Sequence, residues 1–299
     1  MKVRSSTLAI VGLRGAGRRG AERSPARDRL RGKVVLITGG AGGIAAATAQ
    51  RLAAAGAYVS LVDRDQPALD QFVSRLGGSH LATAADVTDH LSLQFAAQRT
   101  VERFGRLDIV FACAGVGSAS TVSASRTDDL LRIVDINLGG VIRTVKATLD
   151  EVTRNRGYYL LMSSAAALKN VPRANAYAAS KAGVEAFGGA LRLELAHKGV
   201  DVGVAHPAWV STGMISGAAT RAGESRSLPW PFSVVSSTDT CAELLVAAMA
   251  ARRRKVFVPR SLALMDPLRW LSTGPVWDAF MKPRAALSVP RLEAAPPNE

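Results

Sequence analysis

From Lys33 onward, short apolar runs alternate with longer segments whose apolar residues recur every three or four positions. A short apolar run bounded by glycine or polar residues is typical of a buried strand, and the wider spacing is typical of an amphipathic helix. The apolar runs predict strands at 34–38, 58–62, 81–84, 107–112, 158–163, 200–205 and 255–258. The segments between them predict helices at 43–55, 66–76, 89–104, 127–153, 175–197 and 238–251.

The regular alternation of strand and helix defines the fold class. Strands that are apolar on both faces must be covered on both sides, and strand–helix–strand units join parallel strands by right-handed crossovers. The sequence therefore predicts a single α/β domain over residues 32–260. It is a doubly wound, Rossmann-type parallel sheet of about seven strands with helices on both faces. The sequence contains no internal repeat, and no linker interrupts this domain.

Two segments depart from the alternation. Residues 212–236 are rich in Gly, Ser and Arg without a regular pattern, which predicts a loop that covers the substrate site. Residues 261–299 form a C-terminal extension, whose first part, 261–284, places apolar and aromatic side chains among prolines and cations. We expect its last part, 285–299, to be disordered.

The formal net charge of +14 lies almost entirely at the two ends of the chain. Residues 1–33 hold ten Lys and Arg against two acids, and residues 252–299 hold nine against four. Residues 34–251 hold the remaining 19 basic and 18 acidic residues, so the body is nearly neutral. Because nucleic-acid enzymes more often carry a basic patch on the body, no specific nucleic-acid partner is predicted. Residues 1–31 are predicted to be a basic, disordered leader, with weak attraction to a membrane or nucleic acid as the alternative.

The sequence also indicates a compartment. Cys113 and Cys241 stand in apolar surroundings, which suits a reducing environment and predicts a cytoplasmic protein without disulfides. The four histidines are scattered, so no metal site is predicted, and no apolar run reaches the roughly 18 residues that span a bilayer. Two expectations remain for the C-terminal extension. One is peripheral membrane contact through Trp270 and Trp277 with nearby cations, and the other is packing over the substrate pocket or a partner subunit.

The first predicted strand runs into a glycine-rich turn, residues 38–45 (TGGAGGIA), that opens the first helix. Glycines let the backbone approach a pyrophosphate, and the helix N-terminus offers free N–H groups. Asp63 ends the second strand, where a carboxylate meets an adenosine ribose hydroxyl and repels a 2′-phosphate. Because no basic residue lies among 40–42, NAD is favoured over NADP, although Arg64 is adjacent. The cofactor-binding residues predicted from this region are Gly39, Gly42, Gly43, Ile44, Asp63 and Arg64.

Tyr177 and Lys181 stand four residues apart in a segment of helical pattern. Both side chains therefore emerge on one face of a helix. An ammonium beside a phenol favours the phenolate and lowers the pKa of the phenol, which can then exchange a proton with an alcohol or carbonyl oxygen. The alternative is an ordinary helical tyrosine beside a solvated lysine.

Further motifs follow in order along the same region: Asp86-Val87 after the third strand, Ala114-Gly115 after the fourth, Asn137, Ser163-Ser164, and Pro207 through Thr212. Together with the glycine turn and the Tyr177/Lys181 pair, these motifs are highly specific. On them the chain, over about residues 31–260, resembles the short-chain dehydrogenase/reductase family.

The resemblance implies an oxidoreductase that acts on CH–OH groups and a role for each matching residue. Tyr177 would be the general acid/base, and Ser164 would hydrogen-bond the substrate oxygen. Lys181 would bind the nicotinamide ribose, and Asn137 would hold a water that links Lys181 to solvent. The implied catalytic residues are Asn137, Ser164, Tyr177 and Lys181. The other implied cofactor contacts are Asp86, Val87, Ala114, Gly115, Tyr177, Lys181, Pro207, Val210 and Thr212.

Three positions depart from the family pattern. Ala45 replaces the last glycine of the turn, Cys113 stands where the family usually has Asn, and Ala208 replaces a glycine after Pro207. The Cys113 substitution removes an amide contact that would stabilise the strand near the cofactor. None of the three removes a proton-transfer group, so activity is expected.

The expected substrate pocket is walled by Ala165–Ala167, by Val116-Gly117 and by the 212–236 loop. Such apolar walls favour a lipophilic ligand. The predicted function is hydride transfer between NAD(H) and a lipophilic secondary alcohol or ketone. The alternatives are an NADP(H)-dependent ketoreductase and a low-turnover cofactor-binding regulator. The resemblance also implies a homodimer or homotetramer built largely from the helices at 127–153 and 175–197.

Overall fold

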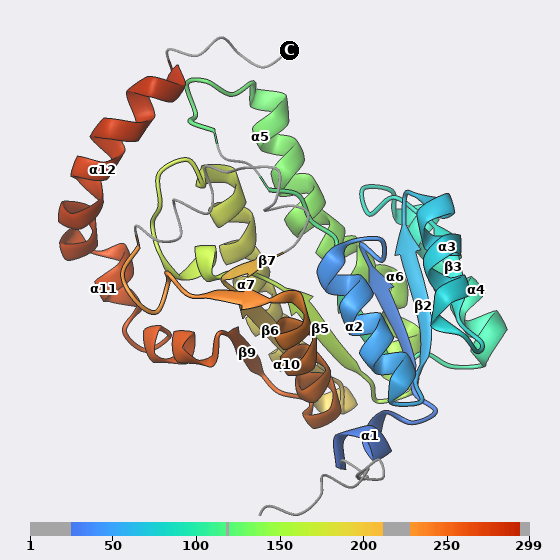
Figure 1. The fold of residues 1–299 in the computed structure, drawn as a ribbon. Helices are drawn as coiled ribbons and strands as arrows, with labels where there is room; N and C mark the ends of the chain where they lie inside the picture. The colour runs from blue at the N-terminus through green and yellow to red at the C-terminus, as the bar shows by residue number, and fades with distance from the viewer. Residues whose placement is uncertain (1–24, 118–119, 212–227, 294–299) are drawn as a thin grey trace, which may run out of the picture.

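The computed structural model of the protein describes residues 25–117, 120–211 and 228–293. Its central sheet has seven strands in the order β3-β2-β1-β4-β5-β6-β9, and every neighbouring pair is parallel (Figure 1). The doubly wound sheet predicted from the sequence is therefore confirmed. The strands are β1 (Val34–Thr38), β2 (Tyr58–Asp63), β3 (Leu81–Ala84), β4 (Ile109–Ala112), β5 (Tyr158–Met162), β6 (Asp201–Pro207) and β9 (Lys255–Val258).

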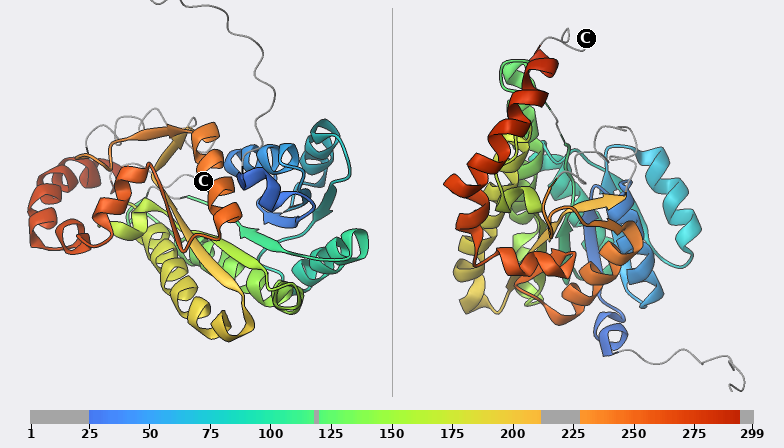
Figure 2. Two further views of the ribbon diagram at one scale, coloured as in Figure 1. Left: turned by 90° about the horizontal axis from the view of Figure 1, so that it is seen from below. Right: turned by 60° about the vertical axis from the view of Figure 1, so that its left-hand side comes forward.

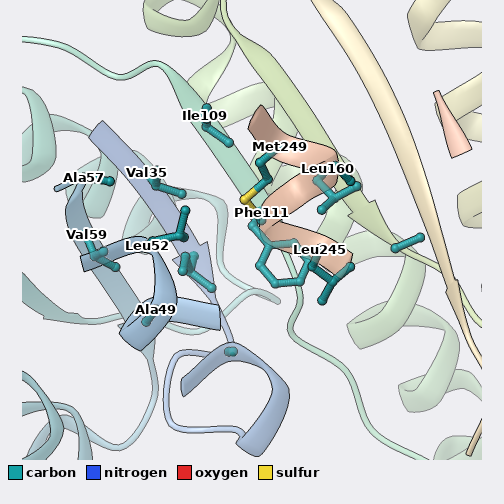
Figure 3. Packing of buried hydrophobic residues seen from close by; sticks show 14 of the residues in the cluster. Val35, Ala49, Leu52, Ala57, Val59, Ile109, Phe111, Leu160, Leu245 and Met249 are labelled. Atoms are coloured by element: carbon teal, nitrogen blue, oxygen red, sulfur yellow. The ribbon is translucent and has the colours of Figure 1, made fainter. Parts of the chain in front are cut away.

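Helices cover both faces of this sheet (Figure 2). One face carries α2 (Gly43–Ala54), α3 (Gln66–Leu76) and α10 (Thr238–Ala251), and the other carries α4 (His90–Phe104), α6 (Gly140–Arg154) and α7 (Asn175–Leu195). In the first layer, Phe111 of β4 lies beside Leu245 and Met249 of α10, while Val35 of β1 lies beside Leu52 of α2 (Figure 3). The strands are buried on both faces, which explains why they appear in the sequence as continuous apolar runs.

The order of the strands creates the place where a ligand can bind. β1 has β2 on one side and β4 on the other, so the direction of winding reverses between β1 and β4. In open α/β sheets, ligands bind in the crevice outside the carboxyl ends of the strands at such a reversal. The glycine turn follows β1, and Ala114-Gly115 follows β4, so both motifs lie at this point.

Two local features were not predicted. The segment 127–153, expected as one helix, consists of α5 (Thr127–Val134), a π-helical turn (Asp135–Gly139) and α6. Two short parallel strands, β7 (Trp209–Ser211) and β8 (Val235–Ser237), form a separate pair beside the main sheet. They bracket the expected substrate loop, whose residues 212–227 lie outside the described part of the chain.

Regular structure begins nearer the N-terminus than the sequence predicted. Residues 25–30 form helix α1, although the sequence predicted disorder through residue 31. Leu30 at its end is 1% exposed and belongs to the same core layer as α2 and α10. The prediction of a disordered leader is therefore wrong for residues 25–30, and residues 1–24 lie outside the described part of the chain.

The C-terminal extension is helical. It consists of a 3₁₀ segment, η4 (Arg260–Met265), and two helices, α11 (Arg269–Thr273) and α12 (Pro275–Glu293). The expected disorder from residue 285 is wrong up to residue 293. A break in the helix was expected because Pro283 and Pro290 lie within it. The helix is instead held at its beginning by buried Trp277 and Met281, and at its end Glu293 accepts a hydrogen bond from the Ser123 hydroxyl. In Figure 1, α12 (red) rises beside the molecule toward the connection that precedes α5.

Among the described helices, none has the combination of length and apolar character that would let it cross a bilayer.

Candidate active site

Tyr177 and Lys181 lie one turn apart in the alanine-rich first half of α7. The Lys181 Nζ lies 5.8 Å from the centroid of the Tyr177 ring. It donates a hydrogen bond of 2.9 Å to the carbonyl oxygen of Met162 at the end of β5, and the lysine is only 3% exposed. Burial lowers the pKa of Lys181 to about 8, so the ammonium form still predominates at neutral pH. A fixed positive charge therefore stands beside the phenol.

Two serines continue the chain from β5 into the site. The Ser163 hydroxyl donates a hydrogen bond of 2.7 Å to the backbone oxygen of Lys181, which joins the strand to α7. Ser164 caps a short 3₁₀ segment, η2 (Ala165–Leu168), by accepting from the Ala166 N–H at 3.1 Å. Its hydroxyl donates to the Pro207 carbonyl at 3.4 Å, which is long for an O–H···O bond. The Ser164 proton can therefore turn to a substrate oxygen at little cost.

Asn137 lies inside the π-helical turn and is completely buried. Its Oδ1 accepts from the Val116 N–H at 2.8 Å, and its Nδ2 donates to the Val116 oxygen at 3.0 Å and to Ser180 Oγ at 3.1 Å. A Cβ built on Gly115 would lie 2.9 Å from Asn137 Oδ1 and 3.3 Å from Lys181 Nζ. The asparagine amide and the lysine ammonium therefore approach the chain after β4 at the same glycine.

The glycine turn after β1 has the geometry that close approach of a pyrophosphate requires. Gly39 has a φ of +71°, and a Cβ there would lie 2.8 Å from the Cα of Ala114. Gly42 is the N-cap of α2, and among the described residues no side chain caps that helix. The first N–H groups of α2 are therefore available to an anion. Gly43 and Ile44, both predicted to bind cofactor, form the first turn of α2.

Asp63 is held at the end of β2 by backbone donors. Its Oδ2 accepts from the Ala41 N–H at 3.1 Å, and its Oδ1 accepts from the Arg64 N–H at 2.7 Å. The carboxylate therefore stands directly beside the glycine turn. The Arg64 guanidinium is turned toward Asp86, with 3.9 Å between the charged atoms, and its side chain is 63% exposed.

The other predicted site residues follow the same edge of the sheet. Asp86 and Val87 come after β3, Ala114 and Gly115 come after β4, Pro207 ends β6, and Val210 is buried in β7. Thr212 lies outside the described residues. The structure thus brings the described members of the predicted set to the carboxyl ends of the strands. The fit to a dinucleotide rests on Gly39, Gly115, the free N-terminus of α2 and the acceptor at Asp63.

Sequence reasoning missed the role of Thr38. Its Oγ1 accepts from the Cys113 N–H at 3.1 Å and lies 3.3 Å from the Ala114 nitrogen. The threonine hydroxyl therefore fixes the end of β4, where the departure at Cys113 had suggested a weakened contact. The signal was present in the sequence, because Thr38 is the polar residue that ends an otherwise apolar strand.

The sequence left open whether the C-terminal extension packs over the substrate pocket, and the structure places α12 at a cavity close to the site. A cavity of about 570 Å³ lies between the segment 166–172, α7 and α12. Ala166 and Ala167 line it and were expected to wall the substrate pocket, but Val116 and Gly117 do not line it, and α12 contributes one side. Residues that line the cavity include Ala166, Ala167, Lys169, Ala178, Ala182 and Met281.

A model of the short chain dehydrogenase family matches residues 33–222. This protein belongs to the short-chain dehydrogenase family.

Its relatives include named enzymes. The chain is 38% identical over 212 residues to (-)-trans-carveol dehydrogenase from Rhodococcus erythropolis, with 64% of this chain and 76% of that protein covered. It is 34% identical over 182 residues to 2-dehydro-3-deoxy-L-rhamnonate dehydrogenase (NAD(+)) from a Sphingomonas species, covering 60% and 73% of the two chains.

Two further comparisons describe how far the likeness extends. The chain is 35% identical over 190 residues, 62% of its length, to glycine betaine reductase ATRR from Emericella nidulans, but spans only 15% of that much longer protein. The crystal structure of gox2181 superposes with a TM-score of 0.71 at 28% identity, covering 78% of this chain and 97% of that one. The family, its fold and an oxidoreductase that acts on CH–OH groups are thereby established.

Proposed function

We propose that the protein transfers a hydride between NAD(H) and a lipophilic secondary alcohol or ketone. The observation that carries this proposal is that the Lys181 ammonium stands beside the Tyr177 ring and bonds Met162 at the end of β5, two residues before Ser164. An acid/base, an oxygen-binding hydroxyl and a fixed cation thus share one edge of the sheet, beside the turn that fits a dinucleotide.

In the direction of alcohol oxidation, Tyr177 accepts the hydroxyl proton through its phenolate oxygen while the carbon loses a hydride. The nicotinamide, when bound, supplies the hydride acceptor. Ser164 donates a hydrogen bond to the substrate oxygen, and the Lys181 ammonium stabilises the phenolate form of Tyr177. In the reverse direction Tyr177 returns the proton to the oxygen as the carbonyl carbon receives the hydride, so protons and electrons balance in both directions.

NAD is proposed over NADP. The fixed carboxylate of Asp63 suits a pair of ribose hydroxyls and would repel a 2′-phosphate. The exposed Arg64 side chain is turned toward Asp86, which leaves less positive charge to compensate the negative charge of a 2′-phosphate. A relative that carries NAD(+) in its name supports this choice. NADP(H) use remains the second candidate, because the Arg64 side chain is exposed enough to turn toward a phosphate.

A lipophilic substrate is proposed because the cavity beside the site is lined mainly by small apolar side chains of the 166–172 segment and α7, with Met281 from α12. The similarity to a dehydrogenase named for carveol supports the same reading.

The deciding experiment is turnover of medium-chain and cyclic secondary alcohols with NAD, followed as absorbance of the reduced cofactor. Tyr177→Phe should lose turnover by about a thousandfold or more but bind NAD with unchanged affinity, because general acid–base catalysis is lost while the dinucleotide site stays. Tyr58→Phe, at an exposed position in β2, is the matched control and should behave as wild type. Equal turnover of Tyr177→Phe and wild type would refute the assignment. NAD binding without any turnover would favour the low-turnover regulator.

We also propose a homodimer or homotetramer that uses α5, α6 and α7. These helices expose Leu131, Ile142 and Leu193, which are 60%, 41% and 73% exposed. Sedimentation of the wild type against Leu193→Glu tests this, because a charge in the interface should shift the protein toward monomer.

Residues 1–24 and the exposed side chains at the start of the C-terminal extension are proposed to act outside the catalytic domain, taken as 32–260, in a cytoplasmic protein. Deletion of residues 1–24 should leave turnover intact. In the C-terminal extension, Trp270 is 64% exposed, Leu268 is 42% exposed and Val276 is 68% exposed, with Arg269 and exposed Arg284 close in sequence. These side chains support peripheral contact with an anionic membrane. Co-sedimentation with liposomes, compared between wild type and Trp270→Ala, tests that contact.

A further inference from the structure

Lys169 is a buried lysine that the catalytic scheme does not use. It stands five residues after Ser164, at the end of η2, and is 6% exposed. Its Nζ lies 4.4 Å from the ring centroid of Phe232 and 5.8 Å from that of Trp209. Burying an ammonium is unfavourable unless a partner compensates it, and the burial lowers the pKa of Lys169 to about 7.

Two other buried charged side chains of the described residues, those of Lys181 and Asp108, have polar partners. Lys181 donates to a carbonyl oxygen, and Asp108 accepts from the side chains of Lys33 and Arg106. No carboxylate and no hydrogen-bond acceptor within the described residues pairs with Lys169 Nζ. Its contacts there are the faces of two aromatic rings, which favour a cation but satisfy none of its hydrogen-bond donors.

The position of Lys169 relates it to the substrate. The lysine lines the cavity of about 570 Å³ between the 166–172 segment, α7 and α12. Trp209 stands two residues after Pro207, the residue whose carbonyl accepts from Ser164. The Trp209 indole N–H donates to the Phe232 oxygen at 3.0 Å, so the two rings that flank the ammonium are held together.

The charge around the cavity selects the kind of group that would bind. Asp278 and Lys282 of α12 also line it and carry opposite charges, so the protonated form of Lys169 leaves the lining with one net positive charge. The other walls are mainly Ala, Val, Pro and Met side chains. One cation in an apolar cavity suits a single carboxylate on a lipophilic molecule, because a phosphate dianion would need more donors.

We propose that Lys169 binds the carboxylate of the substrate, which is then a lipophilic hydroxy acid or the corresponding keto acid. This inference rests on the proposed function for the reacting end of the molecule. The inference places the carboxylate end of the substrate in the cavity beside α12. The carboxylate supplies the acceptor that Lys169 lacks among the described residues, and the aromatic rings keep the ammonium in place before the ligand arrives.

Binding and turnover test the proposal separately. In calorimetry, wild-type protein should bind octanoate at least about tenfold more tightly than 1-octanol. Lys169→Met should bind the two ligands equally, and so should Lys169→Gln, which keeps a polar end should the methionine variant fold poorly. Lys198→Met, an exposed lysine after α7, is the matched control and should keep the preference. In turnover, medium-chain hydroxy acids should exceed their methyl esters in kcat/KM by a similar factor, and Lys169→Met should lose that ratio.

The outcomes separate the two proposals. Equal binding of octanoate and 1-octanol by the wild type, or a preference that survives in both Lys169 variants, would overturn the carboxylate site. Octanoate binding that depends on Lys169, without turnover of any alcohol or hydroxy acid, would uphold the site and refute the proposed function. Turnover of neutral alcohols without a preference for acids would refute only the carboxylate site.

Discussion

The side-chain amide of Asn137 pairs with the backbone of Val116 in both directions, as a donor at 3.0 Å and an acceptor at 2.8 Å. This pairing ties the π-helical turn to the chain after β4, the segment that carries Gly115. A residue expected to act through a bound water is therefore also a structural link in this fold. The link has a measurable energy, because both Val116 groups lose their partner when the amide is removed.

Asn137→Ala should lower the free energy of unfolding by about 1–3 kcal/mol, since buried donors and acceptors lose their partners. NAD affinity should fall as well, because the segment beside the dinucleotide loses its support. Urea unfolding and titration with NAD measure the two effects. Gln98→Ala removes an exposed amide that bonds Glu102 within α4 and should change stability by less than about 0.5 kcal/mol. A stability of Asn137→Ala equal to that of wild type would contradict the role of the amide.

Gly188 and Gly189 are neighbours in α7 with opposite surroundings. A Cβ on Gly188 would lie 2.6 Å from Val204 Cγ2 and 3.2 Å from Leu161 Cδ1, whereas a Cβ on Gly189 would meet nothing within 4 Å. Gly188→Ala should therefore destabilise the protein by about 1–3 kcal/mol through overpacking. Gly189→Ala should stabilise it by about 0.5–1 kcal/mol, because alanine loses less backbone freedom in a helix. Each variant is the control for the other in denaturant unfolding, and effects of equal sign would refute the packing of α7 on β5 and β6.

Glu185, one turn after Lys181, joins α7 to the C-terminal elements. Lys255 Nζ lies 3.0 Å from one carboxylate oxygen, and Arg269 Nη2 and His206 Nε2 lie 3.1 Å and 3.6 Å from the other. Burial alone would raise the pKa of this carboxyl group, but the neighbouring imidazole, ammonium and guanidinium outweigh it and lower the pKa to about 2. The ordinary value is 4.5.

Because the pKa of Glu185 is lower in the folded state, its contribution is complete above about pH 4.5 and is lost as pH falls toward 2. Wild type should exceed Glu185→Gln in stability by about 3 kcal/mol at pH 6 and by about 1 kcal/mol at pH 3. Urea unfolding across this range measures the difference. Glu194→Gln, at an exposed position on the same helix, should differ in stability from wild type by close to zero at every pH in this range. A gap for Glu185→Gln that does not narrow below pH 4.5 would exclude the ionised carboxylate as its source.

Asp63 should control the choice of cofactor. Asp63→Ser removes the negative charge that repels a 2′-phosphate, while the exposed Arg64 remains available to it. We expect the ratio of kcat/KM for NADP to that for NAD to rise by about ten- to a hundredfold, the size of one charge interaction of about 1.4–2.8 kcal/mol. Asp70→Asn, an exposed acid on α3, should leave the ratio unchanged. An unchanged ratio in Asp63→Ser would mean that other groups select the cofactor.

Much of the fold could be predicted from the sequence because its strands are buried on both faces. β1 and β4 appear as unbroken apolar runs, and the glycine turn follows the first of them. The π-helical turn could not be predicted, since one extra residue in a turn leaves the apolar spacing of 127–153 almost unchanged. The full length of α12 was missed because Pro283 and Pro290 indicate a break, while the contacts that hold the helix come from residues far away in the chain.

The candidate site shows the same division. Asn137, Ser164, Tyr177 and Lys181 could be predicted because they stand at fixed spacing in local motifs. Lys169 has no such motif, and in the sequence it resembles any surface lysine after an alanine run. Its burial arises from Trp209 and Phe232, which tertiary packing alone brings to it. Residues whose surroundings are made by distant segments are therefore where the structure adds most.

The two tryptophans of the C-terminal extension should differ sharply on substitution. Trp277 is 6% exposed and packs edge-on against Phe232 at 5.6 Å between ring centroids, and its indole N–H donates to the Asn170 oxygen. Trp270 is 64% exposed.

Trp277→Ala should weaken the attachment of α12 by about 3–5 kcal/mol, the usual cost of truncating a buried aromatic side chain. The helix should then become sensitive to limited proteolysis, and KM for substrate should rise, because α12 forms one wall of the cavity. NAD affinity should not change, since the glycine turn and Asp63 lie elsewhere on the sheet edge. Trp270→Ala should match wild type in all three measurements. If Trp277→Ala kept wild-type resistance to protease and an unchanged KM, α12 would not be part of the substrate site.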